Sequence, residues 1–194
     1  MKLALFDFDG TISNKDSMID FLEYSYGKAN LKRTLITLSP YLLLYKLGCY
    51  SNQKAKERLL SKYFKDMPLT KFQGLALDYS VNRMPLIIKE SAVKKIQWHQ
   101  SQGHRVVVVS ASIEAWLLPW CDKMKIELLS SQLEVYDGLV TGLLYGANCY
   151  GQQKIERIKK SYDLKKYKAI IAYGDSKGDK EMLDLADERH FKPF

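Results

Sequence analysis

The sequence has few cysteines and no pattern that would pair them. Its 194 residues include three, Cys49, Cys121 and Cys149, an odd number without the spacing of a metal site. A disulfide framework of the kind that stabilises small secreted domains is therefore excluded. This use of cysteine indicates a reducing compartment, and we expect the protein to be cytoplasmic.

The sequence also lacks a long apolar run. The uncharged run from Thr34 to Tyr45 is too short to span a bilayer. The apolar N-terminal segment differs from a signal peptide, because Asp7 and Asp9 interrupt it almost at once. Internal repeats and low-complexity tracts are absent as well, so the sequence predicts a folded, globular protein.

The composition is typical of a soluble globular protein, with 46% hydrophobic and 27% charged residues. The length suffices for one domain with a sizeable core, or for a core with an inserted subdomain. Residues 14–85 carry 12 Lys and Arg against 6 Asp and Glu, which is +6 of the net charge of +8. An anionic partner explains this excess, and so does a solvated lysine-rich surface. Nucleic acid is not expected, because aromatic residues are not interleaved with the basic ones.

The apolar and polar patterns predict an α/β protein. Buried strands are expected at residues 3–6, 105–110 and 169–173, helices at 16–26, 51–64, 68–82, 86–101, 113–124, 152–162 and 179–186, and a hairpin turning at Asp137-Gly138. One strand, a block of helices, and then alternating helices and strands indicate a Rossmann-like parallel sheet core with an inserted all-helical cap. We expect residues 1–13 and 86–194 to form the core, and residues 14–85 to form the cap.

Residues 31–47 are strongly apolar and are broken by Pro40. Because Lys32, Arg33 and Lys46 flank the uncharged run, this segment could lie in a membrane interface and give a peripheral membrane contact. We favour the alternative, a helix buried within a helical subdomain.

Polar residues follow each predicted buried strand: Asp7-Phe8-Asp9, Ser110-Ala111-Ser112 and Gly174-Asp175-Ser176. Ligands of open α/β sheets bind outside the carboxyl ends of the strands, so these residues are expected to meet there. In extended geometry Asp7 and Asp9 share a face, and two such carboxylates are costly to bury unless a cation binds between them. Mg²⁺ suits this oxygen-rich setting. Alternatively, the pair is a solvated strand end with a turn at Asp9-Gly10.

Taken together, these motifs resemble those of the haloacid dehalogenase superfamily of phosphohydrolases. The chain most resembles subfamily IB, the branch with the phosphoserine phosphatases, whose helical cap of the C1 type follows the first strand. The four matching motifs, in order, are Asp7-Phe8-Asp9-Gly10-Thr11, Ser110 after four valines, Lys154, and Gly174-Asp175-Ser176-Lys177-Gly178-Asp179.

The resemblance implies a role for each motif. Asp7 would be the nucleophile that forms an aspartyl-phosphate, Asp9 the general acid and base, and Lys154 the cation that neutralises charge around them. Mg²⁺ would be held by Asp7, the backbone carbonyl of Asp9, and Asp175. Asp179 would either hold a water molecule bound to the metal or orient Lys154. Phosphate and substrate would be bound by Thr11, Ser110, Ala111 and Asp16.

Simpler explanations exist for several of these residues. Ser110 could be a helix cap, Lys154 a surface lysine, and Asp175 and Asp179 turn and cap residues. The chain also departs from the phosphoserine phosphatases, because Gly178 stands where an asparagine is usual and Ser176 replaces a glycine. Asp16 and, more weakly, Arg58 match the residues that face serine phosphate, so the sequence does not identify the substrate.

The sequence therefore predicts a Mg²⁺-dependent phosphomonoester hydrolase. Its expected substrate is a small phosphorylated metabolite or a phospholipid head-group precursor. Two alternatives stay open. A phosphotransferase would pass the same aspartyl-phosphate to an alcohol, and a non-catalytic module would bind a phospho-ligand or a membrane.

Overall fold

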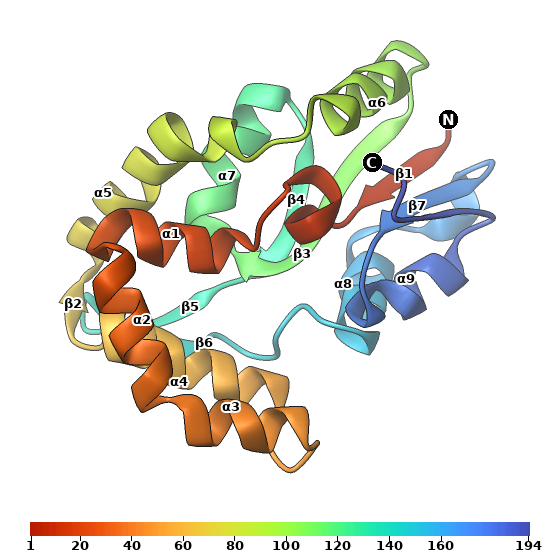
Figure 1. Cartoon of the computed structure of the whole chain (residues 1–194). Coiled ribbons are helices and arrows are strands. Elements are labelled where there is room, and N and C mark those ends of the chain that lie inside the picture. Colours follow the sequence, from red (N-terminus) through yellow and green to blue (C-terminus); the bar gives the residue numbers. More distant parts are fainter.

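A five-stranded sheet forms the centre of the molecule (Figure 1). The computed structural model describes the backbone of residues 1–194 and every side chain except that of Leu42. The strand order is β4-β3-β1-β7-β8, and every neighbouring pair is parallel. The strands are β1 (Leu3–Phe6), β3 (Arg105–Ile113), β4 (Glu127–Ser131), β7 (Ile170–Gly174) and β8 (Glu188–Phe191). The predicted α/β fold with a parallel sheet is confirmed.

The register of the sheet brings the predicted motifs to one edge. Phe6, the last residue of β1, pairs with Val108 of β3 and with Tyr173 of β7. The polar residues that follow these three positions therefore emerge side by side at the carboxyl end of the sheet. Their sequence separation does not matter, because parallel pairing aligns the ends of the strands.

Alternate residues of the strands pack against different helices, as a sheet buried on both faces requires. Leu3, Leu5, Val107 and Val109 belong to the apolar cluster that includes residues of α8 and α9, whereas Ala4, Phe6, Val106 and Val108 belong to the cluster that includes residues of α6 and α7. These helices are α6 (Glu90–Ser101), α7 (Glu114–Met124), α8 (Gln152–Ser161) and α9 (Lys180–Leu185). Burial on both sides explains why the strands read as continuous apolar runs.

Five helices lie between β1 and α6 in the sequence, and Figure 1 shows them together on one side of the sheet. They are α1 (Ser17–Tyr26), α2 (Lys28–Thr37), α3 (Ser39–Lys46), α4 (Asn52–Phe64) and α5 (Leu69–Asp78). The predicted hairpin, β5 (Leu133–Tyr136) and β6 (Leu139–Leu144), pairs with the short β2 (Met67–Pro68) that follows α4. Through this second sheet, β2 of the helical block is hydrogen-bonded to β6 in the later part of the chain. The sequence did not indicate this pairing.

Three local predictions differ from the structure. The helix expected over 86–101 begins at Glu90, because a short 3₁₀ turn at Met84–Leu86 contains Pro85 and the chain then extends. The helix expected over 51–64, α4, begins one residue later at Asn52, because Ser51 is its N-cap and its side chain accepts from Lys54 N at 3.2 Å. The segment 31–47 forms two helices, which meet at Leu38.

The apolar segment 31–47 is only partly buried. Leu31 and Leu38 are in the core, whereas Leu43, Leu44 and Leu47 are exposed. The favoured prediction of a buried helix is therefore right for the first half and wrong for the second. None of the helices in the described chain is long and apolar enough to cross a membrane.

Candidate active site

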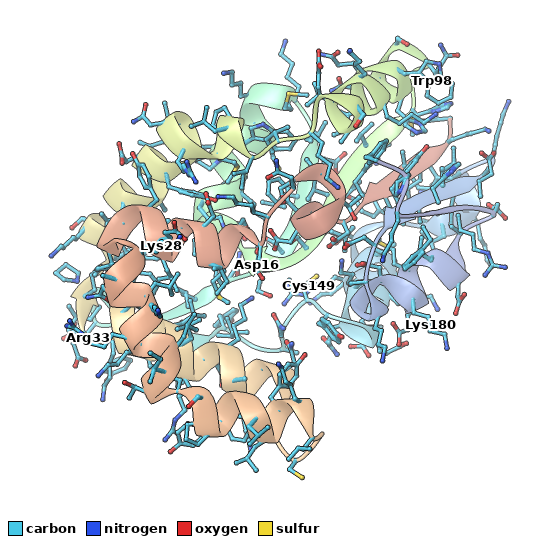
Figure 2. All side chains as sticks on the ribbon, viewed as in Figure 1. Asp16, Lys28, Arg33, Trp98, Cys149 and Lys180 are labelled. Atoms are coloured by element: carbon cyan, nitrogen blue, oxygen red, sulfur yellow. The ribbon has the colours of Figure 1, made fainter. Side chains whose placement is uncertain are left out.

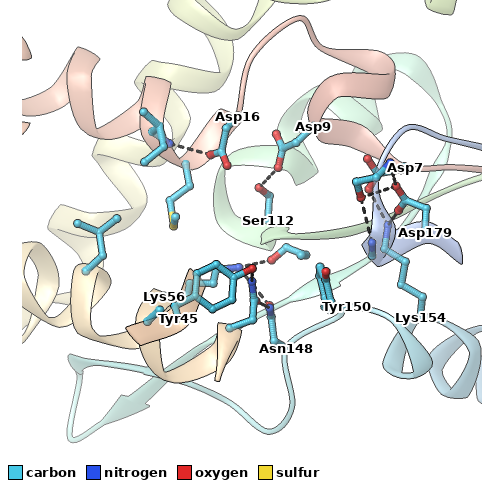
Figure 3. A pocket seen from close by; sticks show the side chains of 18 of the residues that line it. Asp7, Asp9, Asp16, Tyr45, Lys56, Ser112, Asn148, Tyr150, Lys154 and Asp179 are labelled. Atoms are coloured by element: carbon cyan, nitrogen blue, oxygen red, sulfur yellow. Dashed lines mark hydrogen bonds and ion pairs between the residues drawn. The ribbon is translucent and has the colours of Figure 1, made fainter. Parts of the chain in front are cut away.

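The first motif bends away from the sheet directly after β1. The amide of Asp7 still donates to the carbonyl of Tyr173 at 2.9 Å, which fixes the carboxylate at the end of the strand. Gly10 then takes φ +82°, and a Cβ there would overlap the carboxylate of Asp175. Glycine is required because this turn combines a left-handed conformation with a close approach. Asp7 and Asp9 face one cavity, but Figure 3 shows them in different surroundings within it.

Lys154 is the centre of the buried charge network. Its side chain is 2% exposed, and Nζ donates to Asp7 Oδ1 at 2.6 Å, Asp179 Oδ1 at 2.6 Å and the Val109 carbonyl at 2.7 Å. All three ammonium donors are therefore used. Burial alone would lower the pKa of Lys154, but the carboxylates of Asp7 and Asp179 outweigh it and raise the pKa. The surface-lysine alternative is excluded.

Asp179 accepts hydrogen bonds at both carboxylate oxygens, and its Oδ1 orients Lys154. Its second oxygen, Oδ2, accepts from Ser176 Oγ at 2.7 Å and from the amides of Ser176 and Asp175 at 2.9 and 3.2 Å. Ser176 thus fills a structural role at the position where the family usually has glycine. Gly178 is equally constrained, because a Cβ there would overlap the ring of Tyr150. These contacts account for both departures from the usual fourth motif.

Three carboxylates form a cluster suited to a divalent cation. Oxygen atoms of Asp7, Asp175 and Asp179 all lie within 4.8 Å of one another. Thr11 Oγ1 donates to Asp175 Oδ1 at 3.2 Å and so orients this cluster. Burial and the nearby carboxylates raise the pKa of Asp7 to about 7, even though Lys154 opposes the increase. Hard oxygen donors that repel one another fit Mg²⁺, since a bound cation would relieve this repulsion.

Asp9 is held by a separate chain of hydrogen bonds. Its Oδ1 accepts from the amide of Ser17 at 2.7 Å, and its Oδ2 accepts from the hydroxyl of Ser112. Trp116 Nε1 lies 3.2 Å from Ser17 Oγ, which lies 2.8 Å from Ser112 Oγ. Trp116 donates to Ser17, because an indole N–H can only donate. Since Ser112 uses its one proton for Asp9, Ser17 donates to Ser112, and the donors run in order from Trp116 to Asp9. Burial raises the pKa of Asp9 to about 6.

The cavity has a volume of about 450 Å³ and lies between the carboxyl edge of the sheet and the helical block (Figure 3). The core contributes most of its charged groups. From the helical block come two charged residues and several apolar ones: Asp16, Met18, Ile19, Leu35, Tyr45, Lys56 and Leu59. The wall opposite the carboxylates is therefore largely apolar.

Lys56 is a cavity residue that the sequence did not reveal. It projects from α4, is buried, and donates to the Ala111 carbonyl and to Asn148 Oδ1, the latter at 3.2 Å. Burial lowers its pKa to about 8. The weak match at Arg58 does not line this cavity, because Arg58 is exposed and stacks on Tyr41. The sequence of α4 contains several basic residues, so nothing in it distinguished Lys56, which lines the cavity, from Arg58, which does not.

The remaining predicted site residues fall into two groups. Ala111 and Asp16 line the cavity, and Asp16 also caps α1 by accepting from the amide of Ile19 at 3.0 Å. Thr11 and Ser110 do not line it among the described residues: Thr11 contacts Asp175, and Ser110 Oγ accepts from the amide of Ser112 at 3.0 Å. Their assignment to phosphate binding stays a prediction.

Residues 4–184 match the haloacid dehalogenase-like hydrolases. The chain belongs to this family. Protein CicA of Caulobacter vibrioides is 28% identical over 194 residues, which cover 99% of this chain and 86% of that protein. Histidinol-phosphatase of Neisseria meningitidis is 26% identical over 198 residues, covering 96% and 87%. A substrate-bound phosphoserine phosphatase has the same fold, with a TM-score of 0.71 at 22% identity, covering 98% of this chain and 85% of that chain.

These comparisons confirm the predicted resemblance to the phosphoserine phosphatases of the haloacid dehalogenase-like hydrolases. The expected class of protein, an enzyme of this family related to its phosphatases, is confirmed as well. The family match spans all four motifs and the helical block between the first and second.

Proposed function

We propose that this protein is a Mg²⁺-dependent phosphomonoester hydrolase that works through an aspartyl-phosphate at Asp7. The observation that carries the proposal is the buried arrangement of Asp7, Lys154 and Asp179, with Asp9 in the same cavity. A binding module would need neither a fixed nucleophile nor a separate acid beside it. The phosphatase relatives support the same reaction class.

The proposed reaction begins with attack of the Asp7 carboxylate on phosphorus. Lys154 holds one oxygen of Asp7 at 2.6 Å, which leaves the other oxygen to form the new bond. Asp7, Asp175 and Asp179 would hold Mg²⁺, and the bound ion would supply positive charge that offsets the phosphoryl oxygens and keeps Asp7 ionised. The bond from phosphorus to the leaving oxygen breaks as the aspartyl-phosphate forms.

Asp9 would move the protons in both halves of the reaction. It gives its proton to the leaving alcohol in the first step, and it takes one from water as that water attacks phosphorus in the second. The bond between phosphorus and the Asp7 oxygen then breaks, phosphate leaves, and both aspartates return to their starting state. A carboxyl whose pKa burial raises to about 6 suits both roles near neutral pH. Ser17 and Ser112 keep it aimed into the cavity.

We further propose that residues 14–85 act as the cap that selects the leaving group. Asp16 and Lys56 place one negative and one positive side chain on the cap side of the cavity, next to apolar side chains such as Met18 and Leu35. A polar head group bearing a short apolar part matches this lining. The proposed substrate is therefore a small phosphorylated metabolite or a phospholipid head-group precursor.

The test is phosphate release from a panel of phosphomonoesters, lipid phosphates included, with Mg²⁺ and with a chelator. We expect metal-dependent turnover that Asp7→Asn abolishes and that Asp16→Asn retains on an aryl phosphate, because Asp16 is placed at the leaving-group end. Adding alcohols to the assay distinguishes transfer from hydrolysis, since transfer would yield a new phosphomonoester in place of free phosphate. Folded protein with bound Mg²⁺ and no turnover on any substrate would contradict the proposal.

A further inference from the structure

The helices α2 and α3 expose several large apolar side chains to solvent. Leu43, Leu44 and Leu47 are 58%, 41% and 66% exposed, and their spacing of three and four residues places them on one stripe. Ile36, near the end of α2, is 64% exposed. Single exposed leucines are ordinary, whereas four large apolar side chains exposed within twelve residues are typical of a surface that binds something. We call the surface formed by Ile36, Leu43, Leu44 and Leu47, together with the basic residues Lys28, Lys32, Arg33 and Lys46, the α2–α3 face.

The same helices carry only positive charge. Residues 24–56 contain no Asp or Glu. Lys28, Lys32, Arg33 and Lys46 are exposed, and none of them forms an ion pair with a described residue. Figure 2 shows Arg33 at the outer edge of this end of the molecule. Part of the basic excess that the sequence shows for residues 14–85 is thus carried by the same two helices as the exposed apolar side chains.

We propose that the α2–α3 face docks on an anionic lipid bilayer. Leucine and isoleucine side chains would enter the boundary between headgroups and acyl chains, and the four cations would lie against lipid phosphates. Charge complementarity selects this partner. A second copy of the chain would bring the same cations against these, so self-association through this face is opposed by repulsion.

The α2–α3 face lies on the same two helices that line one side of the active-site cavity. Leu35 of α2 and Tyr45 of α3 line the catalytic cavity, while their neighbours Ile36 and Leu44 are exposed outside it. The two helices therefore separate the cavity from the proposed membrane surface. Docking would bring the cavity close to the bilayer, where phosphorylated lipids or their precursors are found. The bilayer contact goes beyond the proposed function and does not depend on catalysis.

Co-sedimentation with vesicles tests the proposal. The full chain is mixed with vesicles of phosphatidylcholine alone or with about one third phosphatidylglycerol, a composition whose surface attracts basic residues. We expect binding to the anionic vesicles that falls at high salt. Leu43→Ser/Leu44→Ser/Leu47→Ser should weaken it about tenfold or more, as should Lys32→Glu/Arg33→Glu. The matched control is Val81→Ser/Leu86→Ser/Tyr136→Ser, which removes three exposed apolar side chains elsewhere and should bind like the wild type.

Thermal melting and turnover of a soluble aryl phosphate establish that each variant is folded, because none of these residues lines the cavity. Equal binding by the leucine variant and the wild type would overturn the proposal. So would absence of binding to anionic vesicles, or a wild-type oligomer that the leucine variant dissociates while vesicles bind neither form. Vesicle binding without any phosphatase activity would contradict the proposed function and leave the docking proposal intact.

Discussion

The two sides of the catalytic cavity are built differently. On the core side, Lys154 and Asp179 have their donors and acceptors committed to one another and to the backbone. On the cap side, Lys56 contacts only a carbonyl and an amide oxygen, and Asp16 is exposed. The side chains on the core side are thus held in place by other protein groups without any substrate. The charged side chains on the cap side have fewer protein partners and are available to bind a substrate.

Under the proposed function, this contrast separates the groups that carry out the reaction from the groups that select the substrate. Groups that stabilise a phosphoryl transfer work best when they are preorganised, because they then need no rearrangement in the transition state. Groups that choose among leaving alcohols need only fit the ground state and can change with the substrate. Substitutions on the core side should therefore cost far more activity than those on the cap side.

The largest expected effect is that of Asp7→Asn, which removes the proposed nucleophile and keeps the shape of its side chain. We expect turnover to fall by about 10⁴-fold or more, with the fold unchanged. Asp16→Asn is the matched change on the cap side, and its effect on an aryl phosphate should stay within about tenfold. Steady-state kinetics on both variants measure the two losses in turnover. Losses of similar size would contradict the proposed difference between the core side and the cap side.

Lys154→Met should come next, because it leaves the carboxylates of Asp7 and Asp179 buried without their cation. We expect a loss of about 10³-fold in turnover and about 3–5 kcal/mol in the free energy of unfolding. Urea denaturation with a chelator present measures the second quantity. The control, Lys160→Met, alters an exposed lysine of the same helix and should change neither value.

Ser112→Ala should impair only the work of Asp9, because it breaks the donor chain that aims this carboxyl. Alkyl phosphates need a proton on their leaving group, so their kcat/KM, which reports the step in which that group departs, should fall about 10- to 100-fold. The kcat/KM of aryl phosphates, whose leaving groups depart without a proton, should be nearly unaffected. The control is Ser130→Ala, a buried serine whose hydroxyl has no partner among the described residues. Equal losses on both substrate classes would indicate a merely structural role.

The smallest effect is on stability and concerns the cap side. Burial lowers the pKa of Lys56 to about 8, below its value near 10.5 in the unfolded chain, so its charge destabilises the fold below pH 8. Lys56→Met should therefore raise the free energy of unfolding by about 1–3 kcal/mol at pH 7. This gain should shrink as the pH rises from 8 to 10.5, because the folded wild type has then already lost the proton. A gain independent of pH, or an equal one in Arg58→Met, would contradict this account.

The core side of the site could be predicted from the sequence because parallel strands align their ends. Asp7, Ser110 and Asp175 follow short apolar runs that the sequence predicts to be buried strands, and Lys154 and Asp179 follow at the positions that the family motifs indicate. Their contacts follow from the register of β1, β3 and β7. Their catalytic roles stay predictions.

The cap side could not be predicted in the same way. Lys56 and Arg58 are indistinguishable in sequence, and only the rotation of α4 places one in the cavity and the other in solvent. The exposure of Leu43 and Leu47 likewise depends on how α3 packs. Apolar residues at helical spacing indicate an apolar face but do not say what covers it. The boundaries of the cap at residues 14–85 stay a prediction for the same reason.

The most direct test of the central claim is to trap the covalent intermediate. Active enzyme is quenched with acid during turnover of an aryl phosphate and is then reduced with borohydride, which converts an aspartyl-phosphate to homoserine. Peptide mass spectrometry should locate homoserine at residue 7, and Asp7→Asn should give none. Turnover with no modification at Asp7, or with modification at Asp9 or Asp175 instead, would contradict the assignment of Asp7 as the nucleophile.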